Sequence, residues 1–432
     1  MRWVVVSVLV WQRFGQAATY LPETYFSPEE AGYRLLPVES RWFLRDIDGF
    51  NPGLALLPEK TAADLDRARL GLPGGYPTYV ATLRVRGGLC PYLTKEDEED
   101  VGMIATTERR GLLRGGRRRL NEPGFATSVA ILDGDLNILQ RVVDESGEPW
   151  DMGREDVRLL TRREFGSKIL TSSMDYPFIG NTREWYSEWR VLWLELHVNE
   201  EDARVTASLA PVLHPDVKGL GTMLQGRNYG IIWRGTASDH LKLLHWLTEF
   251  VDVRTGIPSL EANDVAKTSR LLTGPQNKTL HNNINPIDLE SICPGQYLTV
   301  GHMHLDSTMP AYAYHTKGST GSGNTYGHVF VVFDQEEPYK VCAQSPPFCF
   351  PSVNDPSSCD SIEFVSGAVL QPDNQNVVLT YGVNDCESAY VTMSLQEILR
   401  ITFGNNGDSC NRCSDMGDIQ STFQSTTTSA DD

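Results

Sequence analysis

Hydrophobic and polar positions alternate along much of this chain in short runs that end at turn residues, which is the pattern of β-strands. The pattern is clearest at 364–370, 377–381 and 388–393, where three such runs are separated by turns at 372–376 and 382–385. Runs of this kind, split by Pro, Asn, Asp and Gly, predict an antiparallel meander of three strands. The fold then depends on whether the same unit recurs upstream.

Strand-like runs do recur upstream, about 8–15 residues apart, and they far outnumber segments with helical spacing. The predicted strands are residues 79–86, 127–132, 137–143, 157–160, 168–172, 190–198, 205–213, 229–234, 297–305, 326–334 and 339–344. Residues 50–54 (FNPGL) are predicted as a turn followed by apolar residues, and residues 241–253 as a further strand-like run, with a helix at its start as the alternative. So many strands predict an all-β fold, which is a pair of sandwiches, a large barrel or a propeller.

The segments outside this pattern define the domain organisation. Residues 1–18 are a candidate signal peptide, 19–43 a wrapping segment, 44–402 the folded unit and 403–432 a disordered Ser/Thr-rich tail. An insertion at 88–122 carries an acidic run, KEDEED, followed by an arginine cluster, ERRGLLRGGRRR. We interpret the cluster as a solvated loop balanced by its acidic neighbour, the alternative being an anion or phosphate site.

Three features near the chain ends and in the loops concern location. Arg2 followed by the apolar run at 3–11 resembles a short secretory signal, although a buried first strand fits the same run. The chain has an even count of 8 cysteines and a glycosylation motif at 277–279, and a disulfide could close the loop between Cys349 and Cys359. These features favour the secretory pathway or secretion over a cytoplasmic location. No apolar run approaches the roughly 20 residues needed to span a bilayer.

Charge excludes one class of partner. The hydrophobic content of 40% is that of a globular protein, and 38 basic against 56 acidic side chains give a net charge of −18. An acidic chain of this kind is not expected to bind nucleic acid or an anionic membrane surface. The charge does not identify a substrate.

The segment at 153–159 (GREDVRL) brings two carboxylates and two guanidiniums to the start of a predicted strand. Adjacent side chains on a strand point to opposite faces, so Glu155 and Asp156 are not expected in one pocket. Asp156 and Arg158 share a face, where they could hold a sugar hydroxyl or an anion, and a partly buried Asp can act as a general acid. An ordinary surface ion pair explains the same residue types.

Histidines offer a second set of candidates. His302, His304 and Asp306 share one face of a predicted strand, but a strand that presents polar groups to a cleft explains them as well as a metal does. No metal is therefore expected. His328 lies in an otherwise apolar strand, where a hydrogen-bonded core histidine is the usual outcome. The CxxC at 410–413 lacks the four ligands of structural zinc, and the sequence has no nucleophile elbow, P-loop or dinucleotide motif.

Several short segments occur in an order that resembles glycoside hydrolase family 130, the β-mannoside phosphorylases and β-mannosidases. They are Asn51-Pro52, 155–159 (EDVRL), 227–229 (RNY), 363–367 (EFVSG) and 381–385 (YGVND). None of these motifs is specific alone; their order and the C-terminal meander carry the resemblance, which extends over residues 44–402. The resemblance implies a five-bladed β-propeller, with residues 361–393 in a late blade.

The resemblance also implies a site. The catalytic Asp of the family lies in a Glu-Asp-Pro-Arg segment that matches Asp156 here, with Val157 in place of the Pro and Tyr229 where an Asn-Trp pair is usual. The expected substrate-binding residues are Asn51, Arg158, Arg227, Asn228, His304 and His328. The implied substrate is an oligosaccharide or glycan, and no cofactor is implied.

The implied reaction is inverting cleavage of a β-mannoside-like bond, in which Asp156 delivers a proton towards the glycosidic oxygen. If water attacks, a second carboxylate activates it, and Glu363 and Asp385 are the candidates, at the separation of about 6.5–9.5 Å that is typical of inverting sites. If inorganic phosphate attacks as a co-substrate, basic groups must hold it. The candidates for that role are Arg158, Arg227, His304 and His328. A secretory location favours water.

Two alternatives stay open. The chain could be a catalytically silent glycan-binding module in which aromatic side chains stack on sugar rings. It could also be a related five-bladed glycosidase that acts on furanosides and needs three acidic residues, of which Asp156 and Glu363 would supply two. A second carboxylate in the same funnel as Asp156 favours a hydrolase, whereas an Asp156 buried against Arg158 favours the silent module.

Overall fold

The computed structural model describes most of the folded unit predicted from the sequence. The described residues are 25–26, 28, 32–45, 47, 49–70, 72–85, 126–175, 188–212, 224–225, 229–233, 241–245, 249–252, 280–304, 326–336, 339, 341–360, 362–384 and 386–404. The candidate signal peptide, the 88–122 insertion with its arginine cluster, the glycosylation motif and residues 405–432 lie outside this set.

Within the described residues, the strands form five sheets of three or more strands and one two-stranded pair. The first sheet is β4 (Phe50–Leu56), β5 (Tyr79–Val85), β6 (Ala126–Leu132) and β7 (Ile138–Arg141). The second sheet is β8 (Glu155–Leu160), β9 (Lys168–Asp175), β10 (Glu188–Val198) and β11 (Val205–Pro211), with β12 (Leu224–Gln225) on β10. The third sheet is β13 (Gly230–Trp233), β14 (Leu241–His245) and β15 (Glu249–Asp252). Each of these three sheets is antiparallel.

The last two sheets each include a strand from the N-terminal segment. The fourth sheet is β16 (His281–Asn282), β17 (Ile287–Asp288), β18 (Gln296–His304), β19 (Tyr326–Asp334), β20 (Val341–Gln344) and β21 (Phe348–Cys349), with β2 (Arg34–Leu35) at its edge. The fifth sheet is β23 (Glu363–Leu370), β24 (Asn376–Val383) and β25 (Glu387–Ser394), with β3 (Arg41–Trp42) at its edge. The pair is β1 (Tyr25–Phe26) with β22 (Cys359–Asp360).

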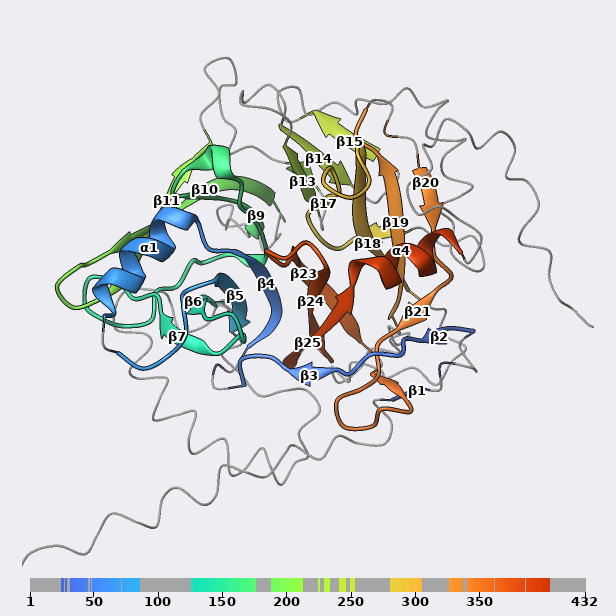
Figure 1. Cartoon of the computed structure of the whole chain (residues 1–432), viewed down its shortest axis with the longest axis horizontal. Coiled ribbons are helices and arrows are strands. Elements are labelled where there is room, and N and C mark those ends of the chain that lie inside the picture. The colour runs from blue at the N-terminus through green and yellow to red at the C-terminus, as the bar shows by residue number, and fades with distance from the viewer. Residues whose placement is uncertain are drawn as a thin grey trace, which may run out of the picture.

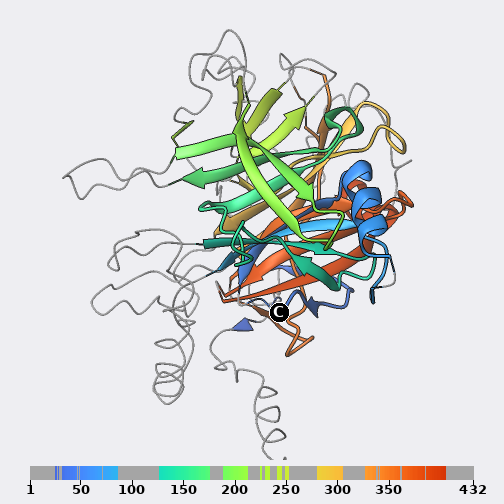
Figure 2. The same cartoon turned by 90° about the vertical axis from the view of Figure 1, so that its left-hand side faces the viewer.

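The five sheets follow one another in chain order around the molecule (Figure 1). Strand β4 of the first sheet contacts β8 of the second and β23 of the fifth. Strand β8 also contacts β13 of the third sheet, and β17 of the fourth sheet contacts β23. The sheets therefore meet through their first strands. Figure 2 shows the first and second sheets from the side, with helix α1 (Glu59–Ala68) along their edge.

The C-terminal meander is confirmed, since β23, β24 and β25 pair in that order with antiparallel register. All side chains of β24 after Asn376 are buried, and β25 alternates between buried and exposed positions along its second half. The remaining predicted strands are found close to their expected limits, and the described structure is mainly β, as predicted.

One local prediction is wrong, and one alternative is decided. Residues 50–54 belong to strand β4 rather than to a turn, because a shift in the pairing with β5 accommodates Pro52, which has no N–H to donate. Residues 241–253 do not begin as a helix, because the segment pairs with β13 and forms the two strands β14 and β15.

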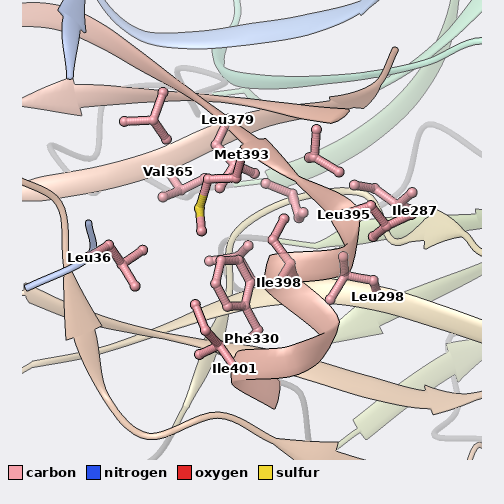
Figure 3. Close-up of a cluster of buried hydrophobic side chains, with 14 of the residues drawn as sticks. Leu36, Ile287, Leu298, Phe330, Val365, Leu379, Met393, Leu395, Ile398 and Ile401 are labelled. Atoms are coloured by element: carbon pink, nitrogen blue, oxygen red, sulfur yellow. The ribbon is translucent and has the colours of Figure 1, made fainter. Parts of the chain in front are cut away.

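Helix α4 (Leu395–Phe403) follows the meander directly and was not predicted. The Ser394 hydroxyl caps its first turn by accepting a hydrogen bond of 3.1 Å from the Glu397 amide. One face of the helix is buried in the largest hydrophobic cluster, between the fourth and fifth sheets. Ile398 and Ile401 lie beside Phe330 of β19 (Figure 3). The helix thus extends the core that the meander begins.

A disulfide joins Cys349 and Cys359, as the sequence suggested, and closes the loop between β21 and β22. Cys293, Cys342 and Cys386 are also disulfide-bonded. Among the described residues, no helix is long and apolar enough to cross a membrane.

Candidate active site

Strands β4 and β8 carry the same irregularity at their N-terminal ends. The pairing of β4 with β5 shifts after Phe50, and the pairing of β8 with β9 shifts after Glu155. Within the shifted segments, Asn51 and Asp156 have φ angles of 49° and 50°. This left-handed conformation is uncommon outside glycine, and Asn and Asp adopt it most readily. A β-bulge of this kind re-aims a side chain out of the regular alternation.

The two bulges direct Asn51 and Asp156 toward each other. Asn51 Nδ2 donates a hydrogen bond of 3.0 Å to Asp156 Oδ1, and both side chains are largely buried. Gly382 on β24 leaves space for the Asn51 amide, because a Cβ atom at this position would overlap Asn51 Oδ1. The carboxylate of Asp156, the predicted catalytic residue, is therefore held by Asn51 of the first sheet, and Asn51 in turn lies against strand β24 of the fifth sheet.

Arg84 on β5 contacts both acidic side chains at the start of β8. Its guanidinium pairs with Glu155 Oε1 and lies 3.6 Å from Asp156 Oδ1. It also lies 4.9 Å from the centre of the Phe50 ring. Glu155 and Asp156 thus share one cationic partner although they are adjacent in sequence, because the bulge interrupts the alternation of a regular strand.

Arg158 is 1% exposed and contacts main chain on both sides. Its Nη1 donates to the carbonyl oxygen of Asp156, and its Nε donates to the carbonyl oxygen of Asn283 at 2.8 Å. The guanidinium lies 5.5 Å from the centre of the Trp189 ring and 5.3 Å from that of Phe364. Burial lowers the pKa of Arg158 to about 10, which the charge of Asp156 opposes, so the side chain is cationic at neutral pH.

The asparagine run at 282–285 joins the sheets at this point, and the sequence analysis missed it. Asn285 accepts a hydrogen bond from the Ile231 amide at 2.8 Å and donates to the Leu159 carbonyl oxygen at 2.9 Å. It therefore bridges the second and third sheets from the fourth. The sequence does carry a signal for this role, which is the run NNIN at 282–285. Three asparagines between apolar strands need hydrogen-bond partners when they are buried.

Asn283 also links Arg158 to His302. The Oδ1 atom of Asn283 contacts His302 Nδ1. The His302 ring stacks on His281 with ring centres 5.0 Å apart, and it meets Phe364 edge-on at 5.4 Å. One connected polar network thus lies beside the aromatic rings. It consists of the Asp156 carbonyl, the Arg158 side chain, Asn283 and the His302 ring.

Glu363 and His328 lie in a second cluster, at the contact between the fourth and fifth sheets. His328 Nδ1 lies 3.9 Å from Glu363 Oε2, and neither side chain has exposed surface. The Glu363 carboxyl accepts hydrogen bonds from the Phe350 amide at 2.9 Å and the Asp360 amide at 3.2 Å. His328 is thus a fully buried core histidine, and its described polar partner is Glu363, including a hydrogen bond to the Glu363 backbone.

Burial sets the titration of this second cluster. It raises the pKa of Glu363 well above its usual value, and the nearby charge of Asp360 raises it further. Burial likewise raises the pKa of Asp360 to about 7 and lowers the pKa of His328 to about 3. The contacts of Glu363 are two backbone amides and a buried histidine rather than solvent, so its carboxyl is placed as a structural acceptor.

The remaining predicted site residues are only partly covered. Arg227, Asn228 and Asp385 lie outside the described residues, as does the side chain of His304, whose main chain pairs with Tyr326 in the fourth sheet. Their roles stay predictions. Within the described part of the chain, no group of three or more His, Cys, Asp or Glu side chains is placed to hold a metal ion.

The site has the parts of a proton-transfer centre. One carboxylate, Asp156, retains a small exposed surface and is held by an amide and a guanidinium from the adjacent sheet. Two cations, Arg84 and Arg158, lie within its immediate surroundings. Such an arrangement can position a carboxyl group against a polar substrate and attract an anion.

Comparison with known proteins adds structural similarity and no sequence match. No protein-family model matches the sequence. No curated protein matches it either.

Solved structures of carbohydrate enzymes are similar to this chain at low identity. A mannose phosphorylase from Leishmania mexicana, solved with phosphate ion, is 13% identical with a TM-score of 0.40, covering 85% of this chain and 90% of that one. A β-1,2-mannobiose phosphorylase from Listeria innocua, solved with β-1,2-mannobiose, is 13% identical with a TM-score of 0.40, covering 88% and 96%. A glycosyl hydrolase from Bacteroides ovatus is 10% identical with a TM-score of 0.41, covering 86% and 94%.

Proposed function

We propose that this chain is a carbohydrate-active enzyme that cleaves a β-mannoside-like glycosidic bond of an oligosaccharide or glycan with inversion. Asp156 donates the proton to the glycosidic oxygen, directly or through a sugar hydroxyl. The observation that carries the proposal is the fixed carboxylate, which accepts from Asn51 at 3.0 Å and lies 3.6 Å from Arg84, on a residue with φ of 50°. Unusual backbone of this kind persists only where its surroundings hold it, and it clusters at active sites.

The same proposal includes the fold, which is a five-bladed β-propeller with one sheet as each blade. It is supported by the contacts between first strands of successive sheets and by the contact of β17 with β23. It is also supported by β3, which brings the N-terminal segment into the last sheet. Blades of antiparallel strands around a common axis bring the ends of their first strands together. That geometry explains why Asn51, Asp156, Asn283 and Phe364 meet.

Water and phosphate, the two candidate attacking groups, make different demands on the described residues. Water requires a second carboxylate as a base. Of the described candidates, Glu155 pairs with Arg84, and Glu363 is enclosed and accepts from two backbone amides. Phosphate requires no base but needs cations, and Arg84 lies beside Asp156. Arg84 is itself paired with Glu155, so both attacking groups are kept: water, which a secretory location favours and for which Asp385 is the candidate base, and inorganic phosphate.

A catalytically silent glycan-binding module is the second candidate. It is favoured by the way in which Asn51 and Arg84 both approach the same oxygen, Asp156 Oδ1. It is also favoured by Val157, which departs from the proline of the resembling family. In this case the carboxylate would orient a sugar hydroxyl without transferring a proton.

The test is sugar release from β-1,2- and β-1,4-linked manno-oligosaccharides by the wild type, Asp156→Asn and Asp135→Asn, with and without inorganic phosphate. Asn tolerates the left-handed backbone at position 156, so the variant removes the acid while keeping the local fold. Loss of a general acid is expected to lower kcat by about 10²–10⁴-fold. Asp135 is an exposed residue of the β6–β7 turn and serves as the matched control.

Each outcome of this assay has one meaning. Mannose 1-phosphate formed only with phosphate, and lost in Asp156→Asn alone, makes the protein a phosphorylase with Asp156 as its acid. Free mannose without phosphate, lost in the same variant, makes the protein a hydrolase with Asp156 as its acid. Turnover that survives Asp156→Asn rejects Asp156 as the acid. Binding of the oligosaccharide with no product under either condition establishes the silent module.

For location, the proposal is the secretory pathway or secretion. Disulfide bonds persist in oxidising compartments and are rare in the cytosol. The Cys349–Cys359 bond and the disulfide bonding of Cys293, Cys342 and Cys386 support this assignment.

A further inference from the structure

We infer that Arg158 is a positioning residue that acts on Asp156 through the protein main chain, rather than a ligand of sugar or phosphate. The inference rests on the proposed function, because it assigns to Arg158 the task of orienting the acid. It differs from the role that the sequence predicts for Arg158, which is to hold substrate.

The contacts of the guanidinium carry this inference. Arg158 Nη1 donates to the carbonyl oxygen of Asp156 itself, two residues earlier on the same bulged strand. Because this hydrogen bond fixes the carbonyl oxygen of Asp156, it limits rotation of the peptide group between Asp156 and Val157. This restraint on ψ of Asp156 acts beside its φ of 50° and beside the 3.0 Å bond that its side chain accepts from Asn51, and so helps to hold the acid in place.

The second contact anchors Arg158 outside its own sheet. Its Nε donates at 2.8 Å to the carbonyl oxygen of Asn283, whose side chain contacts His302 on β18. Asp156 is thereby tied across the molecule to the fourth sheet. A change in the fourth sheet at Asn283 would be transmitted to the acid through one guanidinium.

The surroundings of Arg158 explain why an arginine is needed. The guanidinium carbon lies over two aromatic rings, 5.5 Å from the centre of Trp189 and 5.3 Å from the centre of Phe364. A planar guanidinium can stack on aromatic rings while it donates in two directions in its plane. A lysine ammonium retains the charge but cannot serve two separated carbonyl oxygens in this geometry. With 1% of its surface exposed, Arg158 also presents almost nothing to a ligand.

The experiment compares Arg158→Lys with the wild type and with Arg162→Lys. Arg162 lies just beyond the end of the same strand, is partly exposed and pairs with Asp288 at 3.1 Å, so it is a matched control for the loss of a guanidinium. For Arg158→Lys we expect kcat to fall by about 10²-fold, the effect of a small misplacement of a catalytic group, with KM nearly unchanged. Arg162→Lys is expected to resemble the wild type.

A double-variant cycle separates positioning from binding. If Arg158 acts only through the acid, adding Arg158→Lys to Asp156→Asn produces no further loss of turnover. A rise in KM without a fall in kcat, or losses that multiply in the double variant, would overturn the inference and make Arg158 a substrate ligand.

Two further measurements test the inference if Arg158→Lys does not fold or if the wild type shows no activity. If Arg158→Lys does not fold, Trp189→Phe reduces the ring contact of the guanidinium, and the same fall in kcat at constant KM is expected. If the wild type has no activity, the proposed function fails by itself, and a crystal structure of Arg158→Lys decides. Loss of the positive φ at Asp156 or of the Asn51 bond supports the inference, whereas an unchanged Asp156 overturns it.

Discussion

Asp360 is a single carboxyl group enclosed between the fourth and fifth sheets. It is 1% exposed, and Asn384 Nδ2 approaches its Oδ1 at 3.4 Å. Burial raises its pKa from 3.8 to about 7, partly offset by hydrogen bonds from Ser352 and Asn384. At the residue scale, the protein therefore holds a proton here that the unfolded chain releases near pH 4.

This proton makes stability dependent on pH. Between about pH 4 and pH 7 the folded state binds more protons at Asp360 than the unfolded state, so the free energy of unfolding falls as pH rises. Asp360→Asn removes this dependence. Relative to the wild type, the variant should gain up to about 1.4 kcal/mol per pH unit within this window and no more above it, as measured by urea unfolding across pH.

Two neighbours, Glu363 and His328, must be separated from this effect, and burial raises the pKa of Glu363, so that Glu363 acts in the same direction as Asp360. His328, whose pKa falls from 6.5 to about 3, acts in the opposite direction, because stability is lost as pH drops through that range. The difference between variant and wild type removes these shared contributions.

Asp373→Asn is the control. Backbone amides of Gln375 and Asn376 lower the pKa of Asp373, so the wild type gains stability from this group as pH rises, and the variant becomes less stable relative to the wild type. A flat difference for Asp360→Asn would contradict the assignment.

At the scale of the element, the β-bulges of β4 and β8 decide where the chemistry lies. A regular strand would send Asn51 and its neighbours to alternate faces, whereas the shifted pairing brings Asn51 to Asp156 from the adjacent sheet. The first strand β4 must also lie close to β24, where Gly382 faces the Asn51 amide. The bulge in β4 and the absence of a side chain at Gly382 are thus both needed to place the Asn51 amide against Asp156.

Gly382→Ala tests this arrangement of Asn51 without changing Asp156 itself. The added methyl group overlaps Oδ1 of the Asn51 side chain and approaches the Asn51 main-chain nitrogen, so the side-chain amide must move away from Asp156. We expect loss of the proposed activity together with a destabilisation of about 1–3 kcal/mol from overpacking. Activity assays and urea unfolding measure the two effects.

Gly134→Ala is the matched control for that experiment. Gly134 lies in the β6–β7 turn, where the nearest heavy atom to an added Cβ is Thr78 Oγ1 at 3.7 Å. It should keep both activity and stability. Full activity in Gly382→Ala would show that the Asn51 bond does not position the acid.

At the scale of the whole molecule, one loop fastens the N-terminal segment to the sheets. The Cys349–Cys359 disulfide closes this loop, and Glu363 accepts from the amides of Phe350 and Asp360, the residues directly after each cysteine. Strand β2 pairs with β21 at one end of the loop, and β1 pairs with β22 at the other. The disulfide and the buried carboxyl therefore hold the same two chain segments.

Removing the disulfide should loosen this junction without affecting Asp156. We expect the double variant Cys349→Ala/Cys359→Ala to lose about 2–4 kcal/mol of stability, since the cross-link restricts the unfolded chain. Alanine avoids placing two new hydroxyl groups at positions with no exposed surface. Chemical unfolding measures the loss, with Asn354→Ala, an exposed residue of the same loop, as the control. An unchanged unfolding midpoint would mean that the loop is held by its other contacts.

The sequence by itself determined the elements of this protein, because strands and turns follow from alternation and turn residues over a few positions. The meander of β23 to β25 could be read in this way, the Cys349–Cys359 pair was one that a short loop allowed, and Asp156 became the candidate acid through the resemblance to a known family. Tertiary structure decided what each polar residue contacts. A bulge overrode the alternation at Asn51 and Asp156, and burial turned Arg158 and Glu363 toward main-chain groups. Arg84 and Asn283 join the site only because separate sheets meet there, a contact between residues far apart in sequence that no local pattern records.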